Sequence, residues 1–251
     1  MKRALLVSPT APAQDAAERL RDSYEWVDLR EADMVVALGG DGFMLQTLHD
    51  DHSAGLPVYG MNCGTVGFLM NTFSLDALPE RLALAEEAVL NPLAMTATST
   101  DGRVTQALAI NEVSLLRMGP QAAKLRILVD GKERMPELVC DGCLLSTPAG
   151  STAYNYSAHG PILPIGADVL ALTAVAAFRP RRWRGALLPK GAVVRFEVLD
   201  PLKRPVRADA DTRPVTDVLS VEIRSEPTVR HRILFDPGHG LAERLIVEQF
   251  A

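Results

Sequence analysis

Cysteine, long apolar runs and excess positive charge are all scarce in this sequence, and each scarcity excludes a class of protein. The 251 residues include three cysteines, too few for a disulfide framework, and their odd number suits a reducing compartment. No stretch approaches the roughly 18 uninterrupted apolar residues of a membrane-spanning helix. The apolar run Ala4–Val7 is too short for a signal peptide. We therefore expect a soluble, cytoplasmic protein that does not bind membranes.

The net charge of −5 disfavours a general nucleic-acid-binding protein, because phosphate backbones favour excess Lys and Arg. Two common phosphate-binding signatures are also missing, the P-loop G-x-x-x-x-G-K-[ST] and a strand-linked G-x-G-x-x-G. Phosphate chemistry in this protein would therefore use another loop. The hydrophobic content of 47% is ordinary for a globular protein, so we expect a sizeable buried core.

The first part of the chain alternates between strand-like and helix-like patterns. Strands are predicted at Arg3–Val7, Met34–Leu38 and Pro57–Met61. Helices are predicted at Asp15–Tyr24 with Asp15 as N-cap, at Phe43–Asp50 and at Leu75–Leu90. Such alternation predicts a parallel sheet covered by helices, so residues 1–91 are interpreted as a Rossmann-like α/β domain.

After Asn91-Pro92 the pattern changes to short β-rich runs separated by hairpin signals such as Asp101-Gly102. Strands are predicted at Val104–Val113, Leu125–Val129, Leu138–Cys140, Leu144–Ser146, Val193–Val198 and Val218–Ile223. Hairpins without long helices predict a predominantly β, sandwich-like domain over residues 92–232. The amphipathic segment 233–251 leaves open whether it packs back onto the first domain.

The first group of candidate functional residues is Gly39-Gly40-Asp41-Gly42, between a predicted strand and a predicted helix. Glycines let a backbone approach a phosphate closely, and a helix start offers N–H groups to an anion. Asp41 in such a turn can hold Mg²⁺ or accept a proton from an attacking hydroxyl. The alternative is a plain strand–helix turn in which Asp41 is the N-cap.

Two further polar segments interrupt the β-rich half. Thr147–Ser157 follows a predicted strand and is rich in small hydroxyl residues, which favours a ligand loop over a structural turn into a short helix. In Asn111-Glu112, two polar residues interrupt an apolar strand. They are either a hydroxyl clamp, a β-bulge or a solvent-facing pair.

Together these segments resemble the NAD kinase family, in order and in approximate spacing. The matching motifs are Gly39–Gly42, Met61–Leu69, Asn111-Glu112, Asp141-Gly142 and Thr147–Ser157. The GGDG element alone also occurs in diacylglycerol-type lipid kinases and in phosphofructokinase-like enzymes. The STAY sequence of the last segment, combined with the Asn-Glu pair, is far more specific, and the resemblance spans residues 38 to about 215.

The resemblance implies an enzyme that transfers a phosphoryl group to the 2′-hydroxyl of the adenosine ribose of NAD, giving NADP. It implies that Asp41 is the catalytic residue and that Gly39, Gly40, Asp41 and Gly42 form the phosphate-donor loop. The implied NAD-binding residues are Asp41, Gly42, Asn111, Glu112, Asp141, Thr152, Ala153, Tyr154, Ser157 and, by a loose match, Asp211. A divalent metal, Mg²⁺, and ATP or polyphosphate would be required, in a homodimer or homotetramer; the metal ligands are not predicted.

Three positions depart from the family pattern, and two other functions stay open. Phe43 replaces a Thr or Ser after GGDG, Ala149 replaces a Thr in the TPTGSTAY motif, and Val139 lies where many members have Arg. One alternative function is a lipid kinase that shares the GGDG loop. The other is a sensor that binds NAD or NADP without turnover.

Two remaining features are interpreted as structural. Cys140 and Cys143 have CxxC spacing, but Cys63 and scattered histidines supply no convincing second pair of zinc ligands. The basic residues of the segment 179–184 surround Trp183, and in an acidic protein they favour a solvated surface or a subunit contact over a nucleic-acid site.

Overall fold

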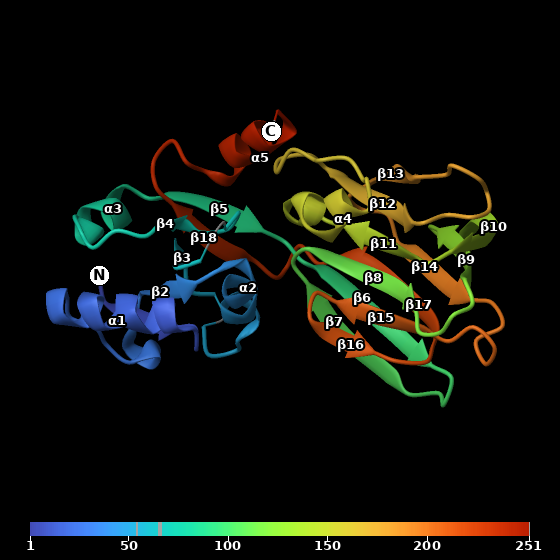
Figure 1. Ribbon diagram of the computed structural model, residues 1–251, viewed down its shortest axis with the longest axis horizontal. Coiled ribbons are helices and arrows are strands. Elements are labelled where there is room, and N and C mark those ends of the chain that lie inside the picture. The colour runs from blue at the N-terminus through green and yellow to red at the C-terminus, as the bar shows by residue number, and fades with distance from the viewer. Residues whose placement is uncertain (54, 65–66, 251) are drawn as a thin grey trace. The chain divides into compact units, whose positions relative to one another are not determined.

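The computed structural model describes residues 1–53, 55–64 and 67–250, and it divides the chain into two compact units. One unit comprises Met1–Leu90 and Arg230–Ala251, and the other comprises Asn91–Val229 (Figure 1). The first unit is therefore built from two separate stretches of sequence.

The first unit is an α/β unit around one six-stranded sheet. Its strands are β1 (Arg3–Val7), β2 (Met34–Gly39), β3 (Val58–Asn62), β4 (Asn71–Thr72), β5 (Glu86–Leu90) and β18 (His231–Phe235). Its helices are α1 (Ala11–Ser23), α2 (Asp41–His49), α3 (Leu78–Leu84) and α5 (Leu241–Gln249), with a 3₁₀ turn η1 (Leu29–Glu31). The sheet order is β1-β2-β3-β18-β5, with β4 paired to β3 outside this path.

The pairing in this sheet is mostly parallel, which confirms the predicted α/β architecture. β1, β2, β3 and β18 are parallel neighbours, and β5 pairs with β18 in the antiparallel sense. Helix α1 covers the sheet through Ala13, Ala17 and Leu20, whose 3.6-residue spacing places them on one face. They pack in the same core cluster as Met34 and Val36 of β2.

The second unit is an antiparallel β-sandwich, which confirms the predicted predominantly β, sandwich-like architecture. One sheet has the order β10-β9-β14-β17-β6-β7 and the other the order β13-β12-β11-β8-β15-β16. The first comprises β6 (Leu93–Ser99), β7 (Val104–Ala109), β9 (Ala123–Val129), β10 (Lys132–Cys140), β14 (Val194–Val198) and β17 (Val218–Ser225). The second comprises β8 (Glu112–Arg117), β11 (Gly142–Ser146), β12 (Val169–Val175), β13 (Gly185–Pro189), β15 (Val206–Ala210) and β16 (Arg213–Val215).

Alternating side chains of both sheets fill one core, which includes Ile127, Phe196 and Leu145. After β11 the chain forms a 3₁₀ turn η2 (Ala149–Thr152) and a short helix α4 (Tyr154–Ser157). Neither these helical turns nor any other helix in the described ranges has the length and apolar character needed to cross a membrane.

Three sequence-based element predictions are wrong in part. The helix expected over Leu75–Leu90 begins at Leu78 and ends at Leu84, and Glu86–Leu90 instead pairs with the distant strand β18. The first helix begins at Ala11 instead of Asp15, since Pro12 in its first turn has no N–H that needs a partner. The strand expected over Val104–Val113 is broken at Ile110 and Asn111.

Candidate active site

The GGDG turn connects β2 to α2, as the strand–helix pattern predicts. Gly40 is the N-cap of α2, with extended backbone, and Asp41 makes no capping bond, so the N-cap alternative for Asp41 is wrong. A side chain at Gly39 would place its Cβ 2.8 Å from the Cβ of Phe43, so only glycine fits beneath this ring. A Cβ at Gly40 or Gly42 would meet nothing within 4 Å, which leaves open space next to the start of α2.

The carboxylate of Asp41 is bound to the backbone of a neighbouring loop. Its Oδ2 accepts a hydrogen bond from the N–H of Phe68 at 2.6 Å, and its Oδ1 accepts one from the N–H of Leu69 at 2.8 Å. Burial raises the pKa of Asp41, although these two N–H groups and the positive charge of Arg244 oppose the increase. Each oxygen keeps a second lone pair for a proton or a cation.

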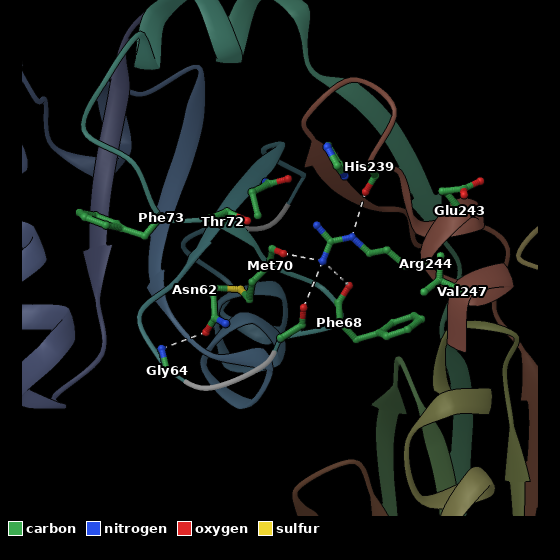
Figure 2. Close-up of a pocket in the computed structure, with 12 residues that line it drawn as sticks. Asn62, Gly64, Phe68, Met70, Thr72, Phe73, His239, Glu243, Arg244 and Val247 are labelled. Carbon is green, nitrogen blue, oxygen red and sulfur yellow. Dashed lines mark hydrogen bonds between the residues drawn. The ribbon is translucent and has the colours of Figure 1, made fainter. Parts of the chain in front are cut away.

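The loop that holds Asp41 borders a pocket of about 660 Å³ within the first unit. Figure 2 shows Arg244 of α5 beside the loop, with its guanidinium directed at the loop carbonyls. The wall also includes Asn62, Phe73 and His239, so polar and aromatic groups face the same space.

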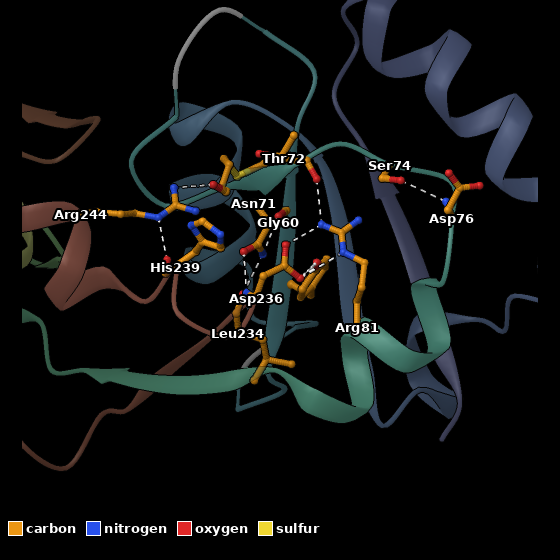
Figure 3. A network of polar contacts seen from close by, with 12 residues as sticks. Gly60, Asn71, Thr72, Ser74, Asp76, Arg81, Leu234, Asp236, His239 and Arg244 are labelled. Atoms are coloured by element: carbon orange, nitrogen blue, oxygen red, sulfur yellow. Dashed lines mark hydrogen bonds and ion pairs between the residues drawn. The ribbon is translucent and has the colours of Figure 1, made fainter. Parts of the chain in front are cut away.

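A polar network fixes the end of β18 near this pocket (Figure 3). The carboxylate of Asp236 accepts two hydrogen bonds from Arg81, at 2.6 and 3.1 Å, and one from the hydroxyl of Tyr59 at 2.6 Å. Burial acts to raise the pKa of Asp236, but the Arg81 and Tyr59 bonds outweigh it and the pKa is lowered. Asn71 joins β3 to β18 by donating to the carbonyl oxygens of Gly60 and Leu234, both at 3.0 Å.

In the second unit, the Asn111-Glu112 pair lies at the break between β7 and β8. The carboxylate of Asp211 accepts hydrogen bonds from the N–H groups of Ile110 (2.7 Å), Asn111 (3.0 Å) and Glu112 (3.3 Å). The hydroxyl of Thr147 donates to the carbonyl of Ile110 at 2.7 Å. Asp211 of the same chain thus holds the backbone of residues 110–112. Ile110 and Asn111 interrupt the strand that was expected over Val104–Val113.

Glu112 is a buried carboxyl group with an unmet hydrogen-bonding requirement. Its Oε2 is buried and has no partner among the described residues. Burial, reinforced by the negative charge of Asp211, raises the pKa of Glu112 to about 8. A buried polar atom without a partner costs free energy, so a ligand hydroxyl is a suitable partner at this position.

The loop Thr147–Ser157 packs closely on the same segment. A Cβ at Gly150 would lie 2.2 Å from the carbonyl oxygen of Asn111, so only glycine permits this approach. Asn155 is fully buried; it donates to the carbonyl of Ser151 at 3.1 Å and accepts from the hydroxyl of Thr173 at 2.6 Å. These internal bonds leave Thr152, Ala153 and Tyr154 half-buried and Ser157 exposed.

Tyr154 lies within electrostatic reach of three carboxylates. Burial raises its pKa, and the charges of Glu112, Asp141 and Asp209 raise it further, in that order. Asp141 also accepts a hydrogen bond from Nε of Arg117 at 2.6 Å. The structure therefore brings together the predicted residues Glu112, Tyr154 and Asp141.

Asp209 belongs to this cluster and was missed by the sequence analysis. It lies on β15 opposite Ser114 and accepts a hydrogen bond from Arg207 at 2.8 Å. Asp209 lies in β15 two residues before Asp211, so its closeness in sequence to a residue already named could have marked it as a candidate.

The two cysteines with CxxC spacing behave as buried structural residues. Cys140 and Cys143 are buried and free, and burial raises the pKa of the Cys140 thiol to about 12. Across the described ranges, no group of three or more His, Cys, Asp or Glu side chains is arranged to hold a metal ion. The basic residues Arg179, Arg181, Arg182 and Arg184 are exposed.

Comparisons with known proteins agree with these features. The family model for the ATP-NAD kinase N-terminal domain matches residues 6–88, and that for the C-terminal domain matches residues 110–209. A NAD kinase of Cereibacter sphaeroides (strain ATCC 17029 / ATH 2.4.9) is 71% identical over 245 residues, which cover 97% of this chain and 96% of that protein. A NAD kinase of Hyphomonas neptunium is 57% identical over 251 residues, covering 100% and 98%.

Two solved structures share the fold. Yeast NADH kinase complexed with NADH superposes with a TM-score of 0.83 at 20% identity, covering 100% of this chain and 87% of that one. A NAD kinase from Archaeoglobus fulgidus in complex with ATP gives a TM-score of 0.76 at 23% identity, covering 95% of each chain.

Proposed function

The chain belongs to the NAD kinase family, and from this premise we propose that it transfers a phosphoryl group from ATP to the 2′-hydroxyl of the adenosine ribose of NAD. The ribose oxygen forms a bond to the γ-phosphorus, the bond from that phosphorus to the β–γ bridging oxygen breaks, and ADP leaves. The hydroxyl proton passes to Asp41. The products are NADP and ADP.

The proposal for Asp41 is supported by its environment. Burial raises its pKa, which makes the carboxylate a stronger base, while two backbone N–H bonds fix its orientation. Phosphoryl transfer depends mainly on positioning and on charge neutralisation. The open space at Gly40 and Gly42 next to the start of α2 suits the phosphates of the donor.

The observation that best supports NAD binding is the buried Oε2 of Glu112, which has no hydrogen-bond partner among the described residues. We assign Asn111, Glu112, Asp141, Thr152, Ala153, Tyr154 and Ser157 to NAD binding, with Asp211 as the residue that holds the backbone of the Asn111-Glu112 segment. A ribose hydroxyl would satisfy the Glu112 carboxyl, and Asn111 offers both a donor and an acceptor.

A divalent cation, Mg²⁺, is part of the proposal. Because the described residues hold no cluster of metal ligands, the cation would be held mainly by oxygen atoms of the donor phosphates. When bound, it neutralises the charge of the transferring phosphoryl group. Asp41 itself orients and deprotonates the acceptor hydroxyl.

The direct test mixes the purified protein with NAD, Mg²⁺ and either ATP or polyphosphate, and measures NADP with a NADP-specific dehydrogenase. We expect NADP with ATP; no product with either donor would contradict the kinase. NAD binding without product under both donors would instead support a sensor. Phosphorylation of diacylglycerol without NADP would support the lipid kinase that shares the GGDG loop.

We also propose that the protein is cytoplasmic and assembles as a homodimer or homotetramer. Its three free thiols suit a reducing compartment. Light scattering coupled to size-exclusion chromatography measures the mass, and a monomer in the presence of NAD would contradict the assembly.

A further inference from the structure

The segment Gly67–Met70 is hydrogen-bonded by two oppositely charged side chains. Asp41 accepts the N–H groups of Phe68 and Leu69. Arg244 donates from a single nitrogen, Nη1, to the carbonyl oxygens of Met70 at 2.6 Å, Gly67 at 3.1 Å and Phe68 at 3.3 Å. An anion thus binds two N–H groups of this segment, and a cation binds three of its carbonyls; Figure 2 shows the contacts made by Arg244.

Tight packing leaves this segment little room to adjust. A Cβ at Gly67 would lie 2.9 Å from Cγ of Met70 and 3.1 Å from Oδ1 of Asp41. Met70 and Leu69 are buried. A change in the carbonyls that Arg244 holds would therefore be transmitted to the N–H groups that Asp41 accepts.

The guanidinium of Arg244 is also held by residues outside the segment 67–70. Its Nε donates to the carbonyl oxygen of His239 at 2.9 Å, and its guanidinium lies 5.2 Å from the ring centroid of Phe235. Its planar fork can hold carbonyls in two directions at once, which a lysine ammonium on a flexible stem does less well. Arg244 lies on α5, beyond the last residue matched by either family model.

We propose that Arg244 is a positioning residue for Asp41: by holding the carbonyls of Gly67, Phe68 and Met70, it fixes the two N–H groups that orient the Asp41 carboxylate. This inference rests on the proposed function, because it assigns Arg244 an effect on the residue that deprotonates the ribose. The C-terminal helix then contributes to turnover without touching substrate.

Removing Arg244 has two separable consequences. Loss of the hydrogen bonds loosens the N–H groups of Phe68 and Leu69, which misplaces the carboxylate; a displacement of about 1 Å can cost about 100-fold in rate. Loss of the positive charge removes one influence that lowers the pKa of Asp41, so the acid limb of the kcat profile moves to higher pH.

The experiment compares Arg244→Met, Arg244→Lys and Arg81→Met with the wild type. Arg81 is the matched control, since its guanidinium also holds a backbone carbonyl of this unit, that of Thr72 at 2.9 Å, but contacts neither Asp41 nor the segment 67–70. For Arg244→Met we expect kcat to fall about 10- to 100-fold, with the KM for NAD changed less than about threefold. The pH at which kcat falls on the acid side of the profile should be higher than in the wild type.

Arg244→Lys, which keeps the charge, should hold the acid limb near the wild-type pH while recovering only part of kcat. Arg81→Met should lower the Tm and leave kcat and the acid limb unchanged. In a readout independent of activity, hydrogen exchange at Phe68 and Leu69 should accelerate at least about tenfold in Arg244→Met and not in Arg81→Met.

The outcomes distinguish the two proposals. A wild type that forms no NADP overturns the proposed function, whereas an active wild type with unchanged kcat, acid limb and exchange in Arg244→Met overturns the role of Arg244. If Arg244→Met does not fold, Arg244→Lys decides. A Lys variant with fully wild-type kcat and exchange would show that the planar contacts to the carbonyls are dispensable.

Discussion

The carboxylate of Asp211 accepts the backbone N–H of Asn111 at 3.0 Å, so a late turn of the chain fixes the first residue of the Asn-Glu pair. Asp211 has a φ of +50°, a left-handed conformation that Asp and Asn tolerate better than most residues. The same side chain accepts the N–H groups on both sides of Asn111. Its role within this chain is therefore to shape the break between β7 and β8.

Replacing Asp211 with Asn should weaken this arrangement without straining the turn. One acceptor oxygen is lost, and we expect the free energy of unfolding to fall by about 1–2 kcal/mol and the Kd for NAD to rise. Urea unfolding and calorimetric titration measure both. Asp101→Asn, at the exposed β6–β7 turn, is the control and should change stability by less than about 0.5 kcal/mol. Unchanged NAD affinity in Asp211→Asn would contradict the assignment.

Asp41→Asn should separate catalysis from binding. The amide oxygen can still accept one of the two N–H groups, so we expect a loss of only about 1–2 kcal/mol in stability. Without a base, kcat should fall about 10²- to 10⁴-fold while NAD binding is retained. The coupled NADP assay and calorimetry test this, and a fully active variant would remove Asp41 from the catalytic role.

Glu112 should make stability depend on pH in a defined window. Its pKa is raised from 4.5 to about 8 in the folded protein, so below pH 4.5 both states are protonated and no penalty exists. As the pH rises towards 8, the unfolded chain releases the proton first, and stability falls. Glu112→Gln should abolish this fall and be about 2–4 kcal/mol more stable than the wild type at pH 8.

Urea unfolding between pH 5 and pH 9 measures this difference. The control is Glu137→Gln, whose side chain is 45% exposed and should give the wild-type pH dependence. Parallel curves for the wild type and Glu112→Gln over the whole range would show that the carboxyl group is not desolvated in the folded protein.

Gly150→Ala should disrupt the loop Thr147–Ser157. The new Cβ would lie 2.2 Å from the carbonyl oxygen of Asn111, so backbone must move, at a cost of about 2–4 kcal/mol, and NAD affinity should fall. Gly119→Ala is the matched control in the same unit, because its Cβ would meet nothing within 4 Å. Equal stability of the two variants by thermal denaturation would contradict the close approach of Gly150 to Asn111.

Local patterns predicted the elements that local forces determine. The predicted strand Arg3–Val7 has those bounds in the structure, and the GGDG turn follows a buried strand as expected. The helix expected over Leu75–Leu90 is correct where Leu78 and Leu82 are buried at helical spacing. It is wrong after Leu84, because the residues that follow pair with strand β18. Pairing with a distant partner leaves no signal in the local periodicity.

The same reasoning applies to the candidate site. The residue types and order of Asp41, Asn111, Glu112 and Tyr154 could be recognised from motifs. The contacts that tune them could not be recognised, because Phe68 and Asp211 lie far in sequence from the residues that they contact. Arg244 belongs to no motif at all. The pKa of Glu112 likewise depends on burial, which only the folded chain defines.

Because β18 lies between β3 and β5, the first unit's sheet cannot be completed until the residues up to Phe235 have left the ribosome. The sandwich, encoded by one continuous stretch, can fold earlier during translation. A nascent chain halted before His231 would expose two unpaired strand edges, and premature termination there would yield an aggregation-prone product instead of a smaller kinase.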